Sequence, residues 1–148
     1  MRTEKKIIKS EANLSKICTS LDSISRFLDR SFNINVGGCC FVASIIAGLL
    51  EEDGIPFDVV VYYDEYFDTF DDIDCSQKHY AIKVNNIIIN NDDRKDDYMV
   101  FNNVTCNDLM EHYIECGWNT WYNSEYNEYV ANILTEFYYA STLSLREE

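Results

Sequence analysis

The 148 residues are enough for one domain with its own hydrophobic core, and a 47% share of hydrophobic residues excludes a disordered chain. The net charge of −14 is unevenly distributed: residues 1–38 hold seven Lys/Arg against four Asp/Glu, whereas residues 39–148 hold five against 22, or −17. Because so acidic a body repels phosphate backbones, we expect no direct nucleic-acid binding and instead an attraction for basic partners.

The first residues, MRTEKKIIKSEANL, lack the apolar stretch of a signal peptide, and the longest apolar run, 39–50, is too short to span a membrane. We therefore expect a cytoplasmic protein without membrane association, in which the six cysteines are reduced thiols. No C-x-x-C motif occurs and the chain has only two histidines, so we expect no metal site. The pattern does not specify an oligomeric state.

Helical spacing of apolar residues predicts a first helix over 11–30, with its core-facing side formed by Leu14, Ile17, Cys18, Leu21, Ile24, Phe27 and Leu28. After Gly37-Gly38 a second helix is expected over 39–53. It is apolar on nearly every side, which indicates burial between two layers. Gly54 is well placed to cap its C-terminus, and Pro56 prevents its continuation.

The segment FDVVVYY (57–63) predicts a strand, and residues 64–74, with six acids among eleven, predict a solvated loop or a lip over the active site. HYAIKV and IIIN flank Asn85-Asn86, a two-residue hairpin turn. Two more helices are expected, one from Thr105 to Gly117 and one capped by Ser124, whose predicted buried face comprises Tyr126, Tyr129, Val130, Ile133, Leu134, Phe137 and Tyr138.

These elements predict a single α+β domain over residues 1–148. A buried central helix packs on a small antiparallel sheet, and flanking helices lie at about 11–30 and 105–140. The helix that begins at the paired cysteines and the hairpin together form a core of about residues 35–93.

The chemistry of the chain centres on Cys39 and Cys40, which open the apolar helix directly after two glycines. A thiol in the first helical turn lies at the positive end of the helix dipole, which favours the nucleophilic thiolate. Glycines let the backbone approach closely, so that nearby amides can serve as oxyanion donors. A nucleophilic cysteine also needs a base, and that base needs an orienting acceptor.

His79 begins the first hairpin strand and is the candidate base. If Asn85-Asn86 forms the turn, opposed residues have numbers that sum to 171, so His79 faces Asp92 across the strands. A three-residue turn would shift the partner of His79 to Asn91 or Asp93. In the two-residue register, the core side of the hairpin is formed by Tyr80, Ile82, Val84, Ile87 and Ile89.

The segment GGCCFVASIIAGLLEEDGIP, followed by a strand and then by HYAIKV and INNDD, resembles the papain-like superfamily. Its likeness is greatest to the transglutaminase-like and arylamine N-acetyltransferase branch and to small phage-type relatives, and it covers about residues 35–93. The resemblance implies a cysteine at a helix start, a histidine about forty residues later, and an Asp or Asn on the neighbouring strand. Cys39, His79 and Asp92 match these positions. Ala81, in place of the usual aromatic residue, and the doubled cysteine depart from the pattern.

Two registers leave both cysteines as candidates for the nucleophile. The transglutaminase-like register has a small residue four positions after the cysteine and a glycine fifteen after, and Cys39 meets both through Ala43 and Gly54. The papain-like register has an aromatic residue directly after the cysteine and a serine four positions after, and Cys40 meets both. We prefer Cys39 because its register holds along the whole helix.

The remaining candidates have smaller expected roles. Asn33 or Asn35 is a candidate for a side-chain amide that donates a hydrogen bond to the oxyanion. His112 is expected on a helix surface. The other cysteines, Cys18, Cys75, Cys106 and Cys116, are expected to be packing or incidental thiols.

The sequence thus predicts a cysteine-dependent hydrolase or acyltransferase that acts on amide bonds of a peptide or protein through Cys39 or Cys40, His79 and Asp92. The acidic body favours a basic substrate. It requires no cofactor. An acetyltransferase would use acetyl-CoA, but the charge of −17 argues against a site for the CoA phosphates. The alternative is a non-catalytic acidic binding protein, such as a phage-encoded inhibitor that imitates DNA and binds a basic host or defence protein.

Overall fold

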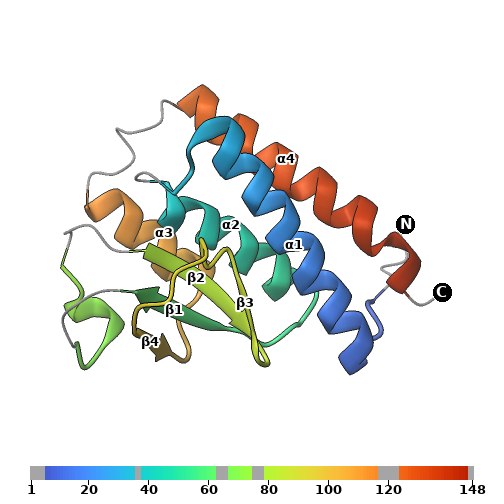
Figure 1. The fold of residues 1–148 in the computed structure, drawn as a ribbon, viewed down its shortest axis with the longest axis horizontal. Coiled ribbons are helices and arrows are strands. Elements are labelled where there is room, and N and C mark those ends of the chain that lie inside the picture. The colour runs from blue at the N-terminus through green and yellow to red at the C-terminus, as the bar shows by residue number, and fades with distance from the viewer. Residues whose placement is uncertain (1–5, 36–37, 63–66, 75–78, 117–123, 147–148) are drawn as a thin grey trace.

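The computed structural model describes residues 6–35, 38–62, 67–74, 79–116 and 124–146. In these residues the fold is α+β, with four α-helices and one small antiparallel sheet (Figure 1). Helix α2 (Cys39–Glu52) lies in the middle, and it packs against the sheet, helix α3 (Cys106–Glu115) and helix α4 (Ser124–Thr142). Helix α1 (Glu11–Phe32) covers α4 and the sheet edge. The predicted α+β class with a buried central helix is confirmed.

The sheet has the strand order β3-β2-β1-β4, and each pair of neighbours is antiparallel. Its strands are β1 (Asp58–Tyr62), β2 (His79–Val84), β3 (Ile87–Ile89) and β4 (Tyr98–Phe101). Strand β4 was not expected from the sequence, because four residues after a charged segment are too few to show a clear alternating pattern. β1 confirms the strand predicted over 57–63 in all but its end residues, and Tyr63 lies outside the described part.

The β2–β3 hairpin has the predicted register, since Ile82 pairs with Ile89, Lys83 with Ile88 and Val84 with Ile87. Asn85 takes a left-handed conformation (φ 54°), as a two-residue hairpin turn requires. The expected core side is also confirmed: Tyr80, Ile82, Val84 and Ile89 are buried in the main core, and Ile87 packs against it.

The apolar helix α2 is buried along nearly its whole length, as its all-round apolarity predicts. It ends in two characteristic hydrogen bonds: Gly54 N–H donates to Glu51 O (3.0 Å) and Ile55 N–H donates to Leu50 O (2.9 Å). Gly54 has φ +66°, a conformation that a side chain disfavours. A Cβ there would also lie 3.1 Å from Lys9 Nζ.

We therefore expect Gly54→Ala to lower the free energy of unfolding by about 1–2 kcal/mol, because the Cβ of alanine makes the left-handed conformation sterically unfavourable. Urea titration measures this change. Gly48→Ala is the matched control: Gly48 lies inside α2, and its added Cβ would meet Cys106 atoms at an ordinary 3.8 Å. Since alanine favours a helix by about 1 kcal/mol over glycine, the control is expected to keep or raise stability. Equal losses in both variants would contradict the interpretation.

The outer helices are less buried than their sequences predict. In α1 the predicted core residues Ile17, Cys18, Leu21, Ile24 and Leu28 are buried and Leu14 packs against them, but Phe27 is 46% exposed. In α4, Val130, Leu134 and Tyr138 are buried, whereas Tyr129 and Phe137 are exposed, and the side chain of Tyr126 lies outside the described part. In both α1 and α4, the buried face is narrower than the apolar face that the sequence pattern predicts.

The two ends of the described chain lie side by side (Figure 1), and Ile7 pairs with Arg146 in an antiparallel bridge. Arg146 also binds the Asp53 carboxylate at the end of α2, with N–O distances of 2.9 and 3.1 Å. The terminal segments are thereby fixed to the central helix.

Candidate functional site

Cys39 and Cys40 are the first two residues of α2 and are both buried, but they face different elements. The Cys39 sulfur accepts hydrogen bonds from the main-chain N–H of Tyr80 on β2 and from the first amides of its own helix. The Cys40 thiol instead donates to Leu109 O of α3 at 3.4 Å. Cys39 is therefore the thiol that lies against the strand carrying His79.

Burial raises the pKa of the Cys39 thiol to about 11, and the hydrogen bonds from Tyr80 and Cys40 N–H only partly oppose it. The pKa of Cys40 is raised further by burial and by its neighbour Cys39. The expectation that the helix N-terminus favours the thiolate at rest is thus not met. Burial destabilises the thiolate by more than the hydrogen bonds from the helix amides stabilise it. Both thiols are neutral at pH 7.

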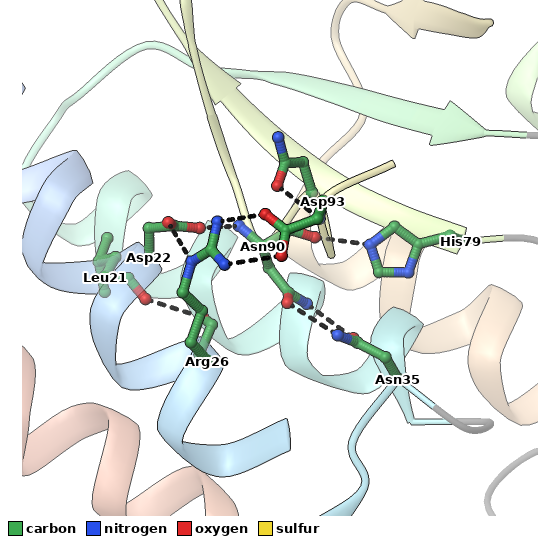
Figure 2. Close-up of polar contacts among 9 residues, drawn as sticks. Leu21, Asp22, Arg26, Asn35, His79, Asn90 and Asp93 are labelled. Atoms are coloured by element: carbon green, nitrogen blue, oxygen red, sulfur yellow. Dashed lines mark hydrogen bonds and ion pairs between the residues drawn. The ribbon is translucent and has the colours of Figure 1, made fainter. Parts of the chain in front are cut away.

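His79 is completely buried at the start of β2, where its ring packs against Tyr62 with centroids 5.8 Å apart. Its Nε2 lies 2.6 Å from the main-chain oxygen of Asn90 (Figure 2). A carbonyl oxygen has no hydrogen to give, so Nε2 carries the proton. Nδ1 is then a lone-pair acceptor, and among the described residues it is buried without a hydrogen-bond partner, Cys39 included. Such an atom costs about 1–3 kcal/mol if it stays unpaired.

The charged form of His79 is disfavoured. Burial lowers the pKa of its imidazole, the hydrogen bond to Asn90 opposes this effect, and the charges of Arg94, Asp92 and Asp29 contribute less. With both groups neutral, His79 and Cys39 do not form a thiolate–imidazolium pair at rest, and the imidazole is available as a general base.

Asp92 does not occupy the position that the register assigns to it. The β2–β3 ladder ends at Ile82 and Ile89, because Asn90 turns the chain with φ 64° and Asp92 itself has φ 57°. Asp92 is exposed and shares no hydrogen bond with His79, on which it acts through charge alone. The acceptor on His79 is the Asn90 carbonyl, two residues earlier in the chain.

The alternatives for the third residue are not joined to His79 either. Asp93 is exposed and binds the Arg26 guanidinium through two hydrogen bonds of 2.9 and 3.1 Å, while Asn91 Oδ1 accepts from Asp93 N–H. Of the proposed oxyanion amides, Asn35 is paired with Asn90, and Asn33 is an exposed left-handed cap at the end of α1. Sequence reasoning missed Asn90 as the acceptor, although it is the last residue of the predicted strand IIIN.

His112 is buried on α3 and not on the helix surface, and its Nε2 lies 2.6 Å from the Tyr80 hydroxyl. Cys116 is disulfide-bonded, and its partner lies outside the described residues, as does Cys75. The expectation of reduced thiols is therefore wrong for Cys116, whereas the other described cysteines, Cys18, Cys39, Cys40 and Cys106, form no disulfide.

The acidic loop also departs from a simple solvated segment. Its described part contains a short 3₁₀ turn, Phe70–Asp72, in which Phe70 is buried against Tyr80, Phe101 and His112. The acids of this part stay exposed. Residues 64–66 lie outside the described part.

Within the described ranges, no group of three or more His, Cys, Asp or Glu side chains is arranged to hold a metal ion. None of the helices described is long and apolar enough to cross a membrane. Comparison of the chain with protein-family models, curated proteins and solved structures finds no match.

Proposed function

We propose that the chain is a cysteine-dependent hydrolase or acyltransferase that acts on amide bonds, with Cys39 as nucleophile and His79 as base. One observation carries this proposal. The buried imidazole of His79 has its Nε2 held by a carbonyl and its Nδ1 left as a free acceptor, while the Cys39 sulfur binds the N–H of the very next residue, Tyr80.

The absence of a hydrogen bond between Cys39 and Nδ1 is compatible with this role. Catalytic hydrogen bonds are often long in enzymes without substrate and shorten in the complex. The Asn90 carbonyl replaces Asp92 as the group that holds the imidazole. A carbonyl fixes the tautomer as a carboxylate does, but it lacks the negative charge that would stabilise an imidazolium.

The reaction follows from these positions. As Cys39 Sγ attacks the carbonyl carbon of the substrate, its proton passes to His79 Nδ1 and the carbonyl electrons move onto oxygen. The Cys40 N–H, which points at the Cys39 sulfur, is placed to stabilise this oxyanion. Nδ1 then returns the proton to the leaving amine, the C–N bond breaks and a thioester remains. Water or a second amine cleaves the thioester and restores the thiol.

We expect the substrate to be a peptide or protein, with basic residues near the bond that is attacked. The net charge of −14 attracts such chains and repels the phosphates of a coenzyme A thioester. No step of the mechanism calls for a cofactor.

Acylation by p-nitrophenyl acetate tests the proposal without a known substrate. At pH 7.5 we expect the acetyl group on Cys39, located by peptide mass mapping, because His79 removes the thiol proton during attack. His79→Ala should slow this acetylation about 100-fold or more, the usual contribution of a general base. His79→Gln is the second variant: it keeps an N–H for the Asn90 carbonyl but has no base, so the same loss is expected.

Two controls locate the nucleophile. Cys40→Ser keeps a donor for Leu109 O and should leave the acetylation of Cys39 unchanged. The half-buried Cys106 serves as an internal reference thiol. If Cys39 reacts no faster than Cys106, or if neither His79 variant slows it, the proposal is wrong.

A second candidate is a non-catalytic acidic binding protein, such as a DNA mimic, which would occupy a basic groove on its target. The burial of Cys39 and His79 favours it, because only 3% of Cys39 and none of His79 is exposed. Neutralising the described acids of the 64–74 loop, Asp68, Asp71, Asp72 and Asp74, separates the two functions. A mimic loses binding to a basic partner, whereas a catalyst keeps the acetylation of Cys39.

A further inference from the structure

Asn90 is the centre of a polar network that reaches three segments far apart in the sequence (Figure 2). It is 3% exposed, and its main-chain N–H donates to Asp22 Oδ1 of α1 at 2.8 Å. Its side-chain amide forms a reciprocal pair with that of Asn35, through two hydrogen bonds of 3.0 and 3.1 Å. Its carbonyl accepts from His79 Nε2. The main-chain N–H, the carbonyl and the side-chain amide of Asn90 therefore each form a hydrogen bond with one of these partners.

These contacts restrict the conformation of Asn90 next to its carbonyl. The residue has φ 64°, and asparagine visits this left-handed region more readily than most other residues. Asp22 holds the peptide unit on one side of the Asn90 Cα, and Asn35 holds the side chain. With these two groups fixed, rotation about the N–Cα bond of Asn90 is restricted, and the carbonyl points at the imidazole.

Helix α1 supports both ends of the network. Arg26 Nε donates to the second oxygen of Asp22 at 3.0 Å, and the same guanidinium binds Asp93 beyond the turn. Asp29 Oδ1 accepts the main-chain N–H of Asn35 at 3.0 Å. The segment that enters α2 and the turn that follows β3 are therefore fixed to the same helix.

We propose that Asn35 and Asp22 are positioning residues, which hold the Asn90 carbonyl so that His79 keeps its proton on Nε2 and presents Nδ1 as the base. Asn35 lies four residues before Cys39, so one amide pair connects the segment of the nucleophile with the acceptor of the base. This inference rests on the proposed function for its catalytic meaning, but the state of the imidazole is measured independently of any reaction.

The test is a long-range ¹H–¹⁵N correlation spectrum of the histidine rings at pH 7.5, where His79 is neutral. Such a spectrum distinguishes the two tautomers, and His79→Ala identifies the signals. In the unmodified chain we expect the Nε2–H tautomer with slow exchange of its proton. In Asn35→Ala and Asp22→Ala we expect a mixture of tautomers and exchange at least about 10-fold faster, because the carbonyl is no longer held.

Three further variants make the result specific. Asp22→Asn keeps an oxygen acceptor for the Asn90 N–H and should restore the original spectrum. Asn132→Ala makes the same change as Asn35→Ala on the exposed side of α4 and should have no effect. If Asn35→Ala fails to fold, Asn35→Asp keeps the bond that Asn90 donates and loses the other, so a smaller change in the same direction is expected.

An unchanged Nε2–H tautomer and unchanged exchange in the folded Asn35 and Asp22 variants would overturn the inference, even if Cys39 proves to be acetylated. Conversely, a shifted tautomer establishes the positioning role even if Cys39 does not react, and in that case only the proposed function is lost.

Discussion

Asp53→Ala is expected to lower the free energy of unfolding by about 3–5 kcal/mol, because it leaves a largely buried guanidinium without its counter-ion. The Asp53 carboxylate accepts both bonds from Arg146 and a third from the Tyr138 hydroxyl at 2.5 Å. The side chains of Asp53 and Arg146 are only 9% and 11% exposed. Arginine keeps its proton at every pH of the experiment, so the variant must either expose the charge or keep it buried without the Asp53 carboxylate.

The neighbouring Glu52→Ala is the matched control. Glu52 also accepts from a tyrosine hydroxyl, that of Tyr139 at 2.8 Å, but the contact is exposed, so we expect a loss of less than about 0.5 kcal/mol. Urea unfolding at pH 7 measures both variants. Adding Arg146→Met to Asp53→Ala removes the buried charge that Asp53 balanced and should recover part of the loss. A loss for Asp53→Ala no larger than that for Glu52→Ala would refute the assignment.

The parts of the fold that could be predicted from the sequence depend on local signals. The Asn85-Asn86 turn sets the hairpin register, and the all-round apolarity of residues 39–53 indicates a helix with protein on every side. The parts that could not be predicted depend on contacts between distant segments. Which apolar residues of α4 are covered is decided by its packing on α1 and α2, and periodicity alone does not contain that information.

The same distinction explains the site. Cys39 and His79 can be proposed because a helix start and a strand start are visible in the sequence. The acceptor of His79 cannot be proposed in this way. Asn90 takes a left-handed conformation at the end of the strand, and it is held by groups 55 and 68 positions away in the sequence. The register rule holds only while the ladder continues, and here it ends at Ile89. Likewise, the raised pKa of Cys39 follows from burial by several elements and not from its place in the helix.

The raised pKa of Cys39 predicts a loss of stability at high pH. The native state holds the thiol proton up to about pH 11, whereas the unfolded chain releases it near pH 9. Below pH 9 the thiol is neutral in both states and its contribution is constant. As the pH rises from 9 to 11 only the unfolded state gains from ionisation, so native stability falls. From this one thiol we expect a loss of about 1.4 kcal/mol at pH 10 and about 2 kcal/mol at pH 11.

Urea unfolding of the unmodified chain and of Cys39→Ala, at pH values from 6 to 10.5, isolates this contribution. Cys18, whose pKa burial also raises to about 11, and Cys40 ionise in both chains, so they cancel in the difference. We expect the difference in unfolding free energy to stay flat up to pH 8.5 and then to move against the unmodified chain.

The opposite sign would have a definite meaning for the mechanism. If Cys39 lost its proton to solvent at rest while His79 stayed neutral, the pKa of Cys39 would be lowered, and the unmodified chain would gain stability over Cys39→Ala as the pH rises from 6 to 9. A proton that passes from Cys39 to His79 stays bound to the native state, so a thiolate–imidazolium pair also gives a flat difference from pH 6 to 8.5. The ring signals of His79 distinguish that pair from the neutral one, because an imidazolium carries a proton on both nitrogens. A gain in this range would overturn the raised pKa of Cys39 and require a thiolate at rest beside a neutral His79.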